Sequence, residues 1–247
     1  MDIGFQLYSA RNADLDETLK TVAALGYTQV EGWGGLYTDP KALRAKLDAN
    51  RLTMPTAHIG LNDLEDTDKC LKIIETLGIK VAVCPWLAPT SRSVTADGWK
   101  KLGDKLEKLA QTYARAGIKF GYHNHDFEFA VYDGKFAMDH LLAAAPSVLA
   151  EVDVAWIVRG KADPAKWLEA NGNRIIAIHV KDIAKPGENA DEDGWADVGT
   201  GVVPWTTLFP LARKVTKAQY FVAEHDNPSD VTRFATRSIA AIKAMGA

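Results

Sequence analysis

Cysteine is scarce in this chain, which has only Cys70 and Cys84 among its 247 residues. Two cysteines at this spacing provide neither a disulfide framework nor the paired ligands of a zinc site. One falls in a segment of helical periodicity and the other in a β-rich run. We therefore expect two buried thiols in a reducing compartment.

An excess of positive charge is also absent, because 29 Lys and Arg residues face 32 Asp and Glu residues, for a net charge of −3. A nucleic-acid backbone or an anionic membrane surface would require a basic patch, so neither is an expected partner. No apolar run approaches the roughly 18 residues that span a membrane, and a strand-like run follows Met1 without signal-peptide features. We expect a cytoplasmic protein with a small-molecule partner, and homo-oligomerisation is left open.

The chain does contain a regular alternation of β-rich runs and segments of helical periodicity, repeated eight times, which is typical of parallel βαβ units. The expected strands are 3–8, 28–31, 53–59, 80–84, 119–124, 149–153, 175–180 and 220–224. The length matches the roughly 250 residues of an eightfold βα barrel, and no linker or low-complexity tract divides it. We predict an α/β fold, a (β/α)8 TIM barrel, as a single domain over residues 1–247.

Polar residues at the ends of the strands distinguish a barrel from an open sheet. In an open sheet the ligand groups gather at one switch point, whereas a barrel brings all eight strand ends around one mouth. Here most strands end in polar side chains: Gln6, Glu31, His58, His123, His125, Asp153, His179, Lys181, Glu224 and Asp226. This distribution favours the barrel and predicts a site at its C-terminal mouth.

Several of these residues occur in pairs two positions apart, such as His123 with His125 and Glu224 with Asp226. Side chains at this spacing point to the same face of a strand. An unpaired charge inside a barrel is very costly, and one bound cation would satisfy several such groups at once. Carboxylates from two strands and an imidazole from a third suit one Mn²⁺, Mg²⁺ or Co²⁺ ion better than Zn²⁺.

Five segments resemble a known family. They are YHNHDFEF at 122–129, DVAW at 153–156, HVKD at 179–182, VGTG at 198–201 and VAE at 222–224. In this order the chain resembles the xylose-isomerase-like TIM-barrel family of sugar phosphate isomerases and epimerases, part of the AP endonuclease family 2 superfamily. The resemblance implies a single divalent metal held by Asp153, His179 and Glu224, together with an acid after the fifth strand.

The chain departs from the commonest pattern of this family in two places. Where many members have Glu-Asn-His in the fifth strand, this chain has His at 123. We therefore expect Glu128 as the fourth metal ligand, with His123 as the alternative. Trp156 stands where epimerase-type members carry a substrate-contacting His and where DNA-repair endonucleases carry a metal ligand. The fifth strand is closer to the inosose-dehydratase-like and keto-sugar-processing branches, and the missing basic patch argues against DNA repair.

The remaining residues near the strand ends are assigned to catalysis or to substrate binding. We expect His125 or Lys181 to move a proton, with His58 as a further catalytic residue. Lys181 could instead form an ion pair with Asp182 or Glu224, and His58 could be a core histidine. The expected substrate contacts are Gln6, Glu31, Trp86, Trp156 and Asp226.

These assignments lead to one preferred reaction and two alternatives. We predict a divalent-metal-dependent sugar isomerase or epimerase that abstracts a proton next to a carbonyl through a metal-stabilised enediolate. Loss of a hydroxyl group from the same species would make the protein a lyase or dehydratase acting on a keto sugar or an inosose. A sugar-binding barrel without catalysis is the other alternative. The long loop 183–203, rich in Gly, Asp and Glu, is expected to act as a lid.

Overall fold

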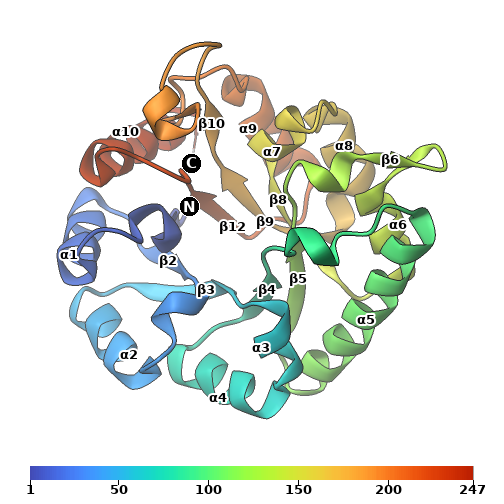
Figure 1. Ribbon diagram of the computed structural model, residues 1–247. Helices are drawn as coiled ribbons and strands as arrows, with labels where there is room; N and C mark the ends of the chain where they lie inside the picture. Colours follow the sequence, from blue (N-terminus) through green and yellow to red (C-terminus); the bar gives the residue numbers. More distant parts are fainter. Residues whose placement is uncertain (247) are drawn as a thin grey trace.

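The computed structural model describes residues 1–246 and forms a closed parallel barrel of eight strands (Figure 1). The barrel strands are β1 (Gly4–Gln6), β2 (Gln29–Gly32), β3 (Thr53–His58), β4 (Val81–Cys84), β5 (Lys119–His123), β8 (Leu149–Asp153), β9 (Ile175–Val180) and β12 (Tyr220–Ala223). Their order around the barrel is β1-β12-β9-β8-β5-β4-β3-β2, so the first strand pairs with the last. The predicted (β/α)8 fold is confirmed.

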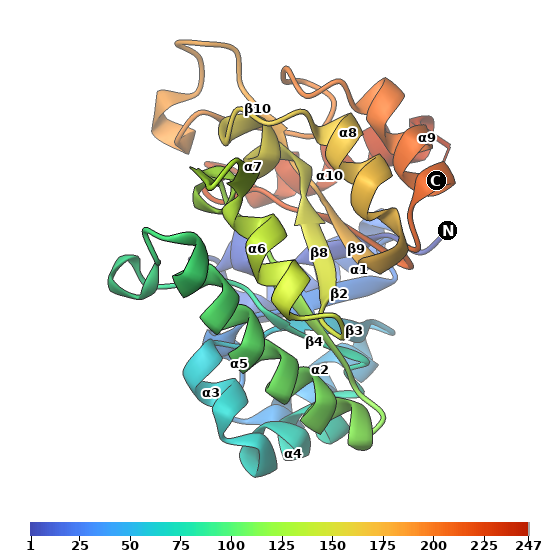
Figure 2. The same cartoon turned by 90° about the vertical axis from the view of Figure 1, so that its right-hand side faces the viewer.

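Helices surround the barrel on its outside (Figures 1 and 2). They are α1 (Leu15–Leu25), α2 (Pro40–Ala49), α3 (Leu61–Glu65), α4 (Thr67–Leu77), α5 (Ala96–Arg115), α6 (Ala137–Ala144), α7 (Val154–Arg159), α8 (Pro164–Asn171), α9 (Trp205–Val215) and α10 (Val231–Ala244). Two short antiparallel pairs lie outside the barrel: β6 (Val131–Tyr132) with β7 (Lys135–Phe136), and β10 (Asp182–Ile183) with β11 (Trp195–Ala196). Figure 2 shows the β10 region above the end to which the β8 arrow points.

The helix ends follow local signals in the sequence. The Asp39 side chain accepts a hydrogen bond from the Ala42 amide at 3.0 Å, and Pro40 occupies the first helical position of α2. Proline is favoured there because its φ is already helical and the amide that it lacks would have no partner in the helix. Gly26 ends α1 with a φ of 93°, a left-handed conformation that costs glycine little. Short turns of this kind bring each helix back to start the next strand.

Alternate residues of the strands face different surroundings. Outward-facing residues such as Ala82 and Ile178 belong to the main apolar core between barrel and helices. Inside the barrel, Val81 and Val83 pack with Ala177 in a separate apolar cluster. The inward face of β9 then becomes polar, because His179 lies two positions after Ala177. The bottom of the barrel is therefore closed by apolar side chains, and the polar residues collect at the mouth.

Two expectations about the rest of the chain can be compared with the structure. Cys70 and Cys84 are both buried and free, as predicted. Burial raises the pKa of the Cys84 thiol to about 12, so this thiol stays protonated at neutral pH. Within residues 1–246, no helix has both the length and the apolar character needed to cross a membrane.

Candidate active site at the mouth of the barrel

A cavity of about 850 Å³ opens at the C-terminal ends of the strands. Its wall includes the side chains of Tyr8, Trp33, Trp86, Phe127 and Trp156. Small-molecule sites are typically concave, with volumes of roughly 300–1,000 Å³, and are lined by aromatic side chains and a few polar groups. The position and lining of this cavity agree with the site predicted from the strand ends.

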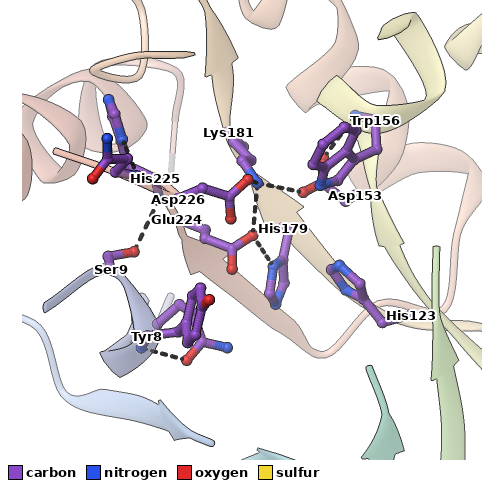
Figure 3. Close-up of polar contacts among 12 residues, drawn as sticks. Tyr8, Ser9, His123, Asp153, Trp156, His179, Lys181, Glu224, His225 and Asp226 are labelled. Carbon is purple, nitrogen blue, oxygen red and sulfur yellow. Dashed lines mark hydrogen bonds and ion pairs between the residues drawn. The ribbon is translucent and has the colours of Figure 1, made fainter. Parts of the chain in front are cut away.

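Four buried side chains at one end of the cavity could hold a metal ion. His123, Asp153, His179 and Glu224 offer ligand atoms that all lie within 4.8 Å of one another. They come from the ends of β5, β8 and β9 and from the residue after β12 (Figure 3). The Oδ2 atom of Asp153 is buried and has no hydrogen-bond partner, although it lies 3.5 Å from the Lys181 ammonium. Two imidazoles, two carboxylates and a free carboxylate oxygen fit a divalent cation.

We call these four residues, His123, Asp153, His179 and Glu224, the metal cluster. The charges around them also suit a cation. Burial disfavours a charged imidazole, yet Glu151, Glu224 and Glu31 together raise the pKa of His179 well above its usual value. Burial lowers the pKa of His123 well below its usual value, which keeps this ring in the neutral form that binds metals. The carboxylates thus create a strongly negative potential at ring nitrogens that are able to coordinate.

Glu128, the expected fourth ligand, does not take part in the metal cluster. The structure instead places His123, the alternative, beside Asp153, His179 and Glu224. One carboxylate oxygen of Glu128 accepts a hydrogen bond from the Tyr122 hydroxyl at 2.6 Å, and the other accepts one from the His125 amide at 2.7 Å. Burial raises the pKa of Glu128 to about 7. Because both oxygens are engaged away from the cluster, Glu128 fixes the backbone at His125.

Hydrogen bonds from Asn124 and from the Trp156 amide hold Asp153 in position. The Asn124 side chain donates to the Asp153 carbonyl at 3.0 Å and accepts from the Asp153 amide at 3.1 Å. The Oδ1 atom of Asp153 accepts a hydrogen bond from the Trp156 amide at 2.9 Å and so caps α7. One oxygen of Asp153 is therefore fixed by the helix, while its Oδ2 atom remains available to a metal.

A second layer of carboxylates lies deeper in the barrel, behind the imidazoles. Glu31 Oε1 lies 2.7 Å from His179 Nε2, and Glu151 Oε1 lies 3.1 Å from His123 Nδ1. A carboxylate that accepts the rear N–H of a metal-binding histidine fixes its tautomer and orientation. His179 Nδ1 faces Glu224 Oε2 at 2.9 Å, so a cation between them would take Nδ1 of His179 and Nε2 of His123 as ligands. The sequence places Glu151 on the same strand face as Asp153, two residues away, but sequence reasoning gave it no role in the site.

The deeper layer also contains a second group of possible metal ligands. His58, His123, Glu151 and His179 are buried and close enough to hold an ion. This group shares both His123 and His179 with the metal cluster. A neutral imidazole has one free lone pair for coordination, so each shared ring can bind a metal on only one side. The two groups therefore compete for the same histidines.

We expect Glu31→Gln to weaken metal binding by about 10- to 100-fold while the protein stays folded, because the charge that orients His179 is lost. Competition of the purified variant with a fluorescent chelator measures this affinity directly. Asp63→Asn is the matched control, because Asp63 lines the cavity without contacting the cluster. Equal affinity of the Glu31 variant and the wild-type protein would show that Glu31 does not support the cluster.

Gln6 and Glu31, which the sequence placed in contact with substrate, lie beneath the cavity instead. Both are fully buried, and the Gln6 amide donates to Glu31 Oε1 at 2.6 Å. Their side chains are used in the deeper layer because a buried carboxylate must be paired. The other three expected substrate contacts, Trp86, Trp156 and Asp226, do line the cavity.

Lys181 is fully buried and forms ion pairs rather than lining the cavity (Figure 3). Its Nζ atom lies 2.5 Å from Asp226 Oδ2 and 3.4 Å from Glu224 Oε2. Although burial opposes it, these carboxylates raise the pKa of Lys181. The lysine is therefore a fixed positive charge rather than a proton carrier. Its neighbour Asp182 is not its partner, since that carboxylate accepts hydrogen bonds from backbone amides of the following loop.

His125 and His58 both line the cavity but differ in their hydrogen bonding. The Nδ1 atom of His125 has no partner, and burial together with the Lys181 charge lowers its pKa to about 3. His58 Nε2 lies 2.6 Å from Glu151 Oε1, and the carboxylates of Glu31 and Glu151 raise the pKa of His58 to about 10 against the effect of burial. His125 is thus a neutral imidazole with a free nitrogen, whereas His58 is engaged by the deeper layer.

The loop expected to act as a lid, 183–203, is anchored at several points. Its residue Trp195 is buried, and the Trp156 ring packs edge-on against it with 4.7 Å between centroids. Glu192 accepts a hydrogen bond from Arg233 of α10 at 2.7 Å. Residues 185–191 are exposed, and Asp193 lines the cavity. The lid role stays a prediction, and any closing movement would involve the exposed part.

The sequence of the chain matches a known protein family. A sequence profile of the family "Xylose isomerase-like TIM barrel" matches residues 19–245. The chain belongs to this family. Its members include sugar-processing isomerases, epimerases and dehydratases, so the predicted resemblance is confirmed.

Individual relatives of the chain carry different activities in their names. Inosose dehydratase from Geobacillus kaustophilus is 28% identical over 193 residues, which cover 68% of this chain and 62% of the dehydratase. A sugar phosphate isomerase/epimerase from Parabacteroides distasonis has a TM-score of 0.80 at 23% identity, covering 97% of this chain and 92% of the other. A probable 3-DHS dehydratase from Bacillus anthracis has a TM-score of 0.76 at 13% identity, covering 100% and 99%. At these identities the two structures support the fold alone.

Proposed function

We propose that this protein is a divalent-metal-dependent sugar isomerase that moves a proton from the carbon next to the carbonyl of an unphosphorylated keto sugar to the carbonyl carbon. One observation carries the proposal. His125 lines the same cavity as His123 and Glu224 of the metal cluster, and its Nδ1 atom has no hydrogen-bond partner. A proton acceptor and a cation site on one substrate cavity are the two groups that enolisation needs.

The chain's own residues have separate tasks in this reaction. A cation held by the metal cluster would polarise neighbouring carbonyl and hydroxyl oxygens of the sugar. His125 takes the proton from the carbon next to the carbonyl at a ring nitrogen and returns it to the former carbonyl carbon. The hydroxyl proton of the first carbon passes to the former carbonyl oxygen, so that the carbonyl and the hydroxyl exchange places. Lys181 holds the negative charge of Asp226 and Glu224 in place, and Trp156 packs beside His125 with 5.1 Å between ring centroids. A single proton carrier serves transfer on one face of the sugar, which favours isomerisation over epimerisation.

The charge of the cavity favours a substrate without phosphate. Its lining contains five carboxylates and two guanidinium groups: Asp63, Asp126, Asp193, Glu224 and Asp226 against Arg11 and Arg92. The Arg11 side chain is bonded to backbone carbonyls of Tyr8 and Asp226. Both guanidinium groups already donate to backbone carbonyls, whereas the carboxylates of the lining can accept hydrogen bonds from the hydroxyl groups of a sugar.

The ligand set also narrows the choice of metal. Two nitrogen and two oxygen donors suit Mn²⁺ or Co²⁺, whereas Mg²⁺ prefers oxygen donors and retains several waters. We therefore propose Mn²⁺ or Co²⁺ as the ion in this site.

Dehydration is the second candidate, favoured by the 28% identity to inosose dehydratase. It begins with the same proton transfer to His125. The C–O bond of a hydroxyl one carbon further on then breaks, and the hydroxyl leaves as water with a proton. The two outcomes share the carbonyl-adjacent proton transfer and differ only in whether the proton returns to carbon or the hydroxyl leaves.

Reaction in D₂O with a panel of unphosphorylated keto sugars and inososes tests the proposal. We expect deuterium at the carbon next to the carbonyl, with an isomer of otherwise unchanged mass as the product. Loss of 18 mass units would assign the protein to the dehydratases. Because direct return of the same proton can hide solvent exchange, substrate deuterated at that carbon is run in parallel. Binding without turnover would indicate a sugar-binding barrel, and product that keeps all of its deuterium at the original carbon would exclude the proposed step.

A further inference from the structure

The cavity continues from the metal cluster to its rim along one wall of flat groups. The ring of His125 lies 5.2 Å from that of His123, and the Phe127 ring stacks on His125 at 5.6 Å with an angle of 14° between planes. The Arg92 guanidinium lies 3.7 Å above the Phe127 ring and 5.5 Å from Trp86. These groups form a continuous surface from the floor of the site to solvent, which we call the rim wall.

The rim wall is held in place before any ligand binds. Arg92 Nε donates a hydrogen bond to the Leu87 carbonyl at 3.0 Å, which fixes the guanidinium over Phe127. Phe127 also stacks on Trp99 of α5. Trp86, in contrast, keeps 47% of its surface exposed at the cavity mouth. An aromatic ring that is exposed beside a cavity is available to pack against a ligand.

A second pair of aromatic rings lies across the cavity. Tyr8 follows β1 and Trp33 follows β2, with their rings in edge contact at 5.4 Å. In the barrel order β1 lies opposite β5, the strand that leads to Phe127. The outer cavity is therefore a slot with flat groups on both sides. Such a slot accepts a ring whose faces are apolar, either a pyranose or an aryl group.

The volume of the cavity agrees with a ligand larger than one sugar. At about 850 Å³ it lies in the upper part of the range for sites that hold drug-sized molecules. A keto sugar placed with its carbonyl at the metal cluster and its proton at His125 would fill only the inner part. The outer part would then hold a substituent of that sugar.

We propose that the outer cavity is a subsite for a second ring joined to the keto sugar by a glycosidic bond, so that the substrate is a keto-glycoside. The inference rests on the proposed function, because it assumes that the sugar carbonyl lies at the metal cluster. A glycosidic bond blocks the anomeric carbon, so the carbonyl lies elsewhere on the pyranose ring. An oxidation of a ring hydroxyl must therefore supply this substrate.

Three substrates that differ only in the aglycone test the subsite. They are the 3-keto derivatives of methyl β-glucoside, phenyl β-glucoside and cellobiose, each assayed by deuterium exchange. We expect KM for at least one ring-bearing substrate to be about 3- to 10-fold lower than for the methyl compound, the gain of about 0.5–1.5 kcal/mol that one aromatic contact provides. The arm that gains more shows whether the second ring is an aryl group or a sugar.

Trp86→Ala should remove this gain, so that KM for the ring-bearing substrate rises to that for the methyl compound in the same variant. Val131→Ala is the matched control, because Val131 is exposed outside the cavity. Equal KM values for all three substrates in the wild-type protein, or an equal rise for all three in Trp86→Ala, would overturn the subsite and leave the proposed function intact.

Absence of exchange with these compounds and with free keto sugars would instead contradict the proposed function. The subsite then remains measurable by calorimetry with the unoxidised glycosides. Tighter binding of phenyl glucoside or cellobiose than of methyl glucoside, lost in Trp86→Ala, would support it. Equal binding of the three glycosides would overturn it.

Discussion

Asp153→Asn and Glu224→Gln should each leave the protein folded but without bound metal after dialysis. Each substitution keeps the size of the side chain and removes one of the two carboxylate charges of the metal cluster. Asn at 153 can still accept the hydrogen bond from the Trp156 amide, so the start of α7 is preserved. An open site with four protein ligands has few to spare, and metal affinity depends on their charge. Elemental analysis of the purified proteins measures the stoichiometry.

Asp193→Asn provides the control for this experiment. Asp193 lines the cavity but lies outside both groups of possible metal ligands among residues 1–246. Its variant should therefore retain the wild-type amount of metal. Full metal content in both Asp153→Asn and Glu224→Gln would disprove the assignment. Loss in only one variant would leave the site in place and identify the indispensable carboxylate.

His125→Phe should reduce turnover by about 10²- to 10⁴-fold and leave the metal content unchanged. The phenyl ring can keep the contacts with Phe127 and Trp156, whereas the nitrogen that accepts the proton is removed. Deuterium exchange into the keto sugar should fall by the same factor, because His125 acts in the proton transfer itself. Parallel measurements of turnover, exchange and bound metal separate this role from a structural one.

Lys181→Met is the informative comparison for that experiment. Lys181 is fully buried and paired with acids, so its loss should disturb metal binding together with turnover. His125→Phe should disturb turnover alone. A His125 variant that exchanges deuterium at the wild-type rate would contradict the assignment of this residue as the proton carrier.

The fold could be predicted from the sequence because the strand pattern and the signals at helix starts and ends all indicate the same architecture. Eight β-rich runs, Asp-Pro starts of helices and glycines at helix ends all specify βα units, and each predicted strand overlaps an observed one. The closure of the barrel followed from the polar strand ends, since residues as distant in sequence as Glu31 and Glu224 become neighbours only around a shared mouth. Side-chain alternation then placed these groups inside the barrel.

The site was less predictable because spacing along a strand does not reveal hydrogen-bond partners. Glu128 was the expected fourth ligand, with His123 as the alternative, until the structure placed Tyr122 and the His125 amide on the two oxygens of Glu128. Glu31 and Lys181 lie at strand ends, as a substrate-binding group would, yet Glu31 is paired below the cavity and Lys181 is fully buried in ion pairs. Which inward residue reaches the cavity depends on its depth in the barrel, and no short sequence motif specifies that depth.

The strands carry the metal cluster and the loops carry the rim of the cavity, which affects how this protein can evolve. The metal cluster is fixed by the register of the barrel strands, whereas Trp86 and Phe127 belong to the segments that come after β4 and β5. Such segments tolerate substitution and insertion better than the strands that carry them. Duplicated copies of the gene can therefore diverge in the size and shape of the accepted molecule while inheriting the same chemistry. A library randomised at the rim alone should yield new selectivities with few inactive members.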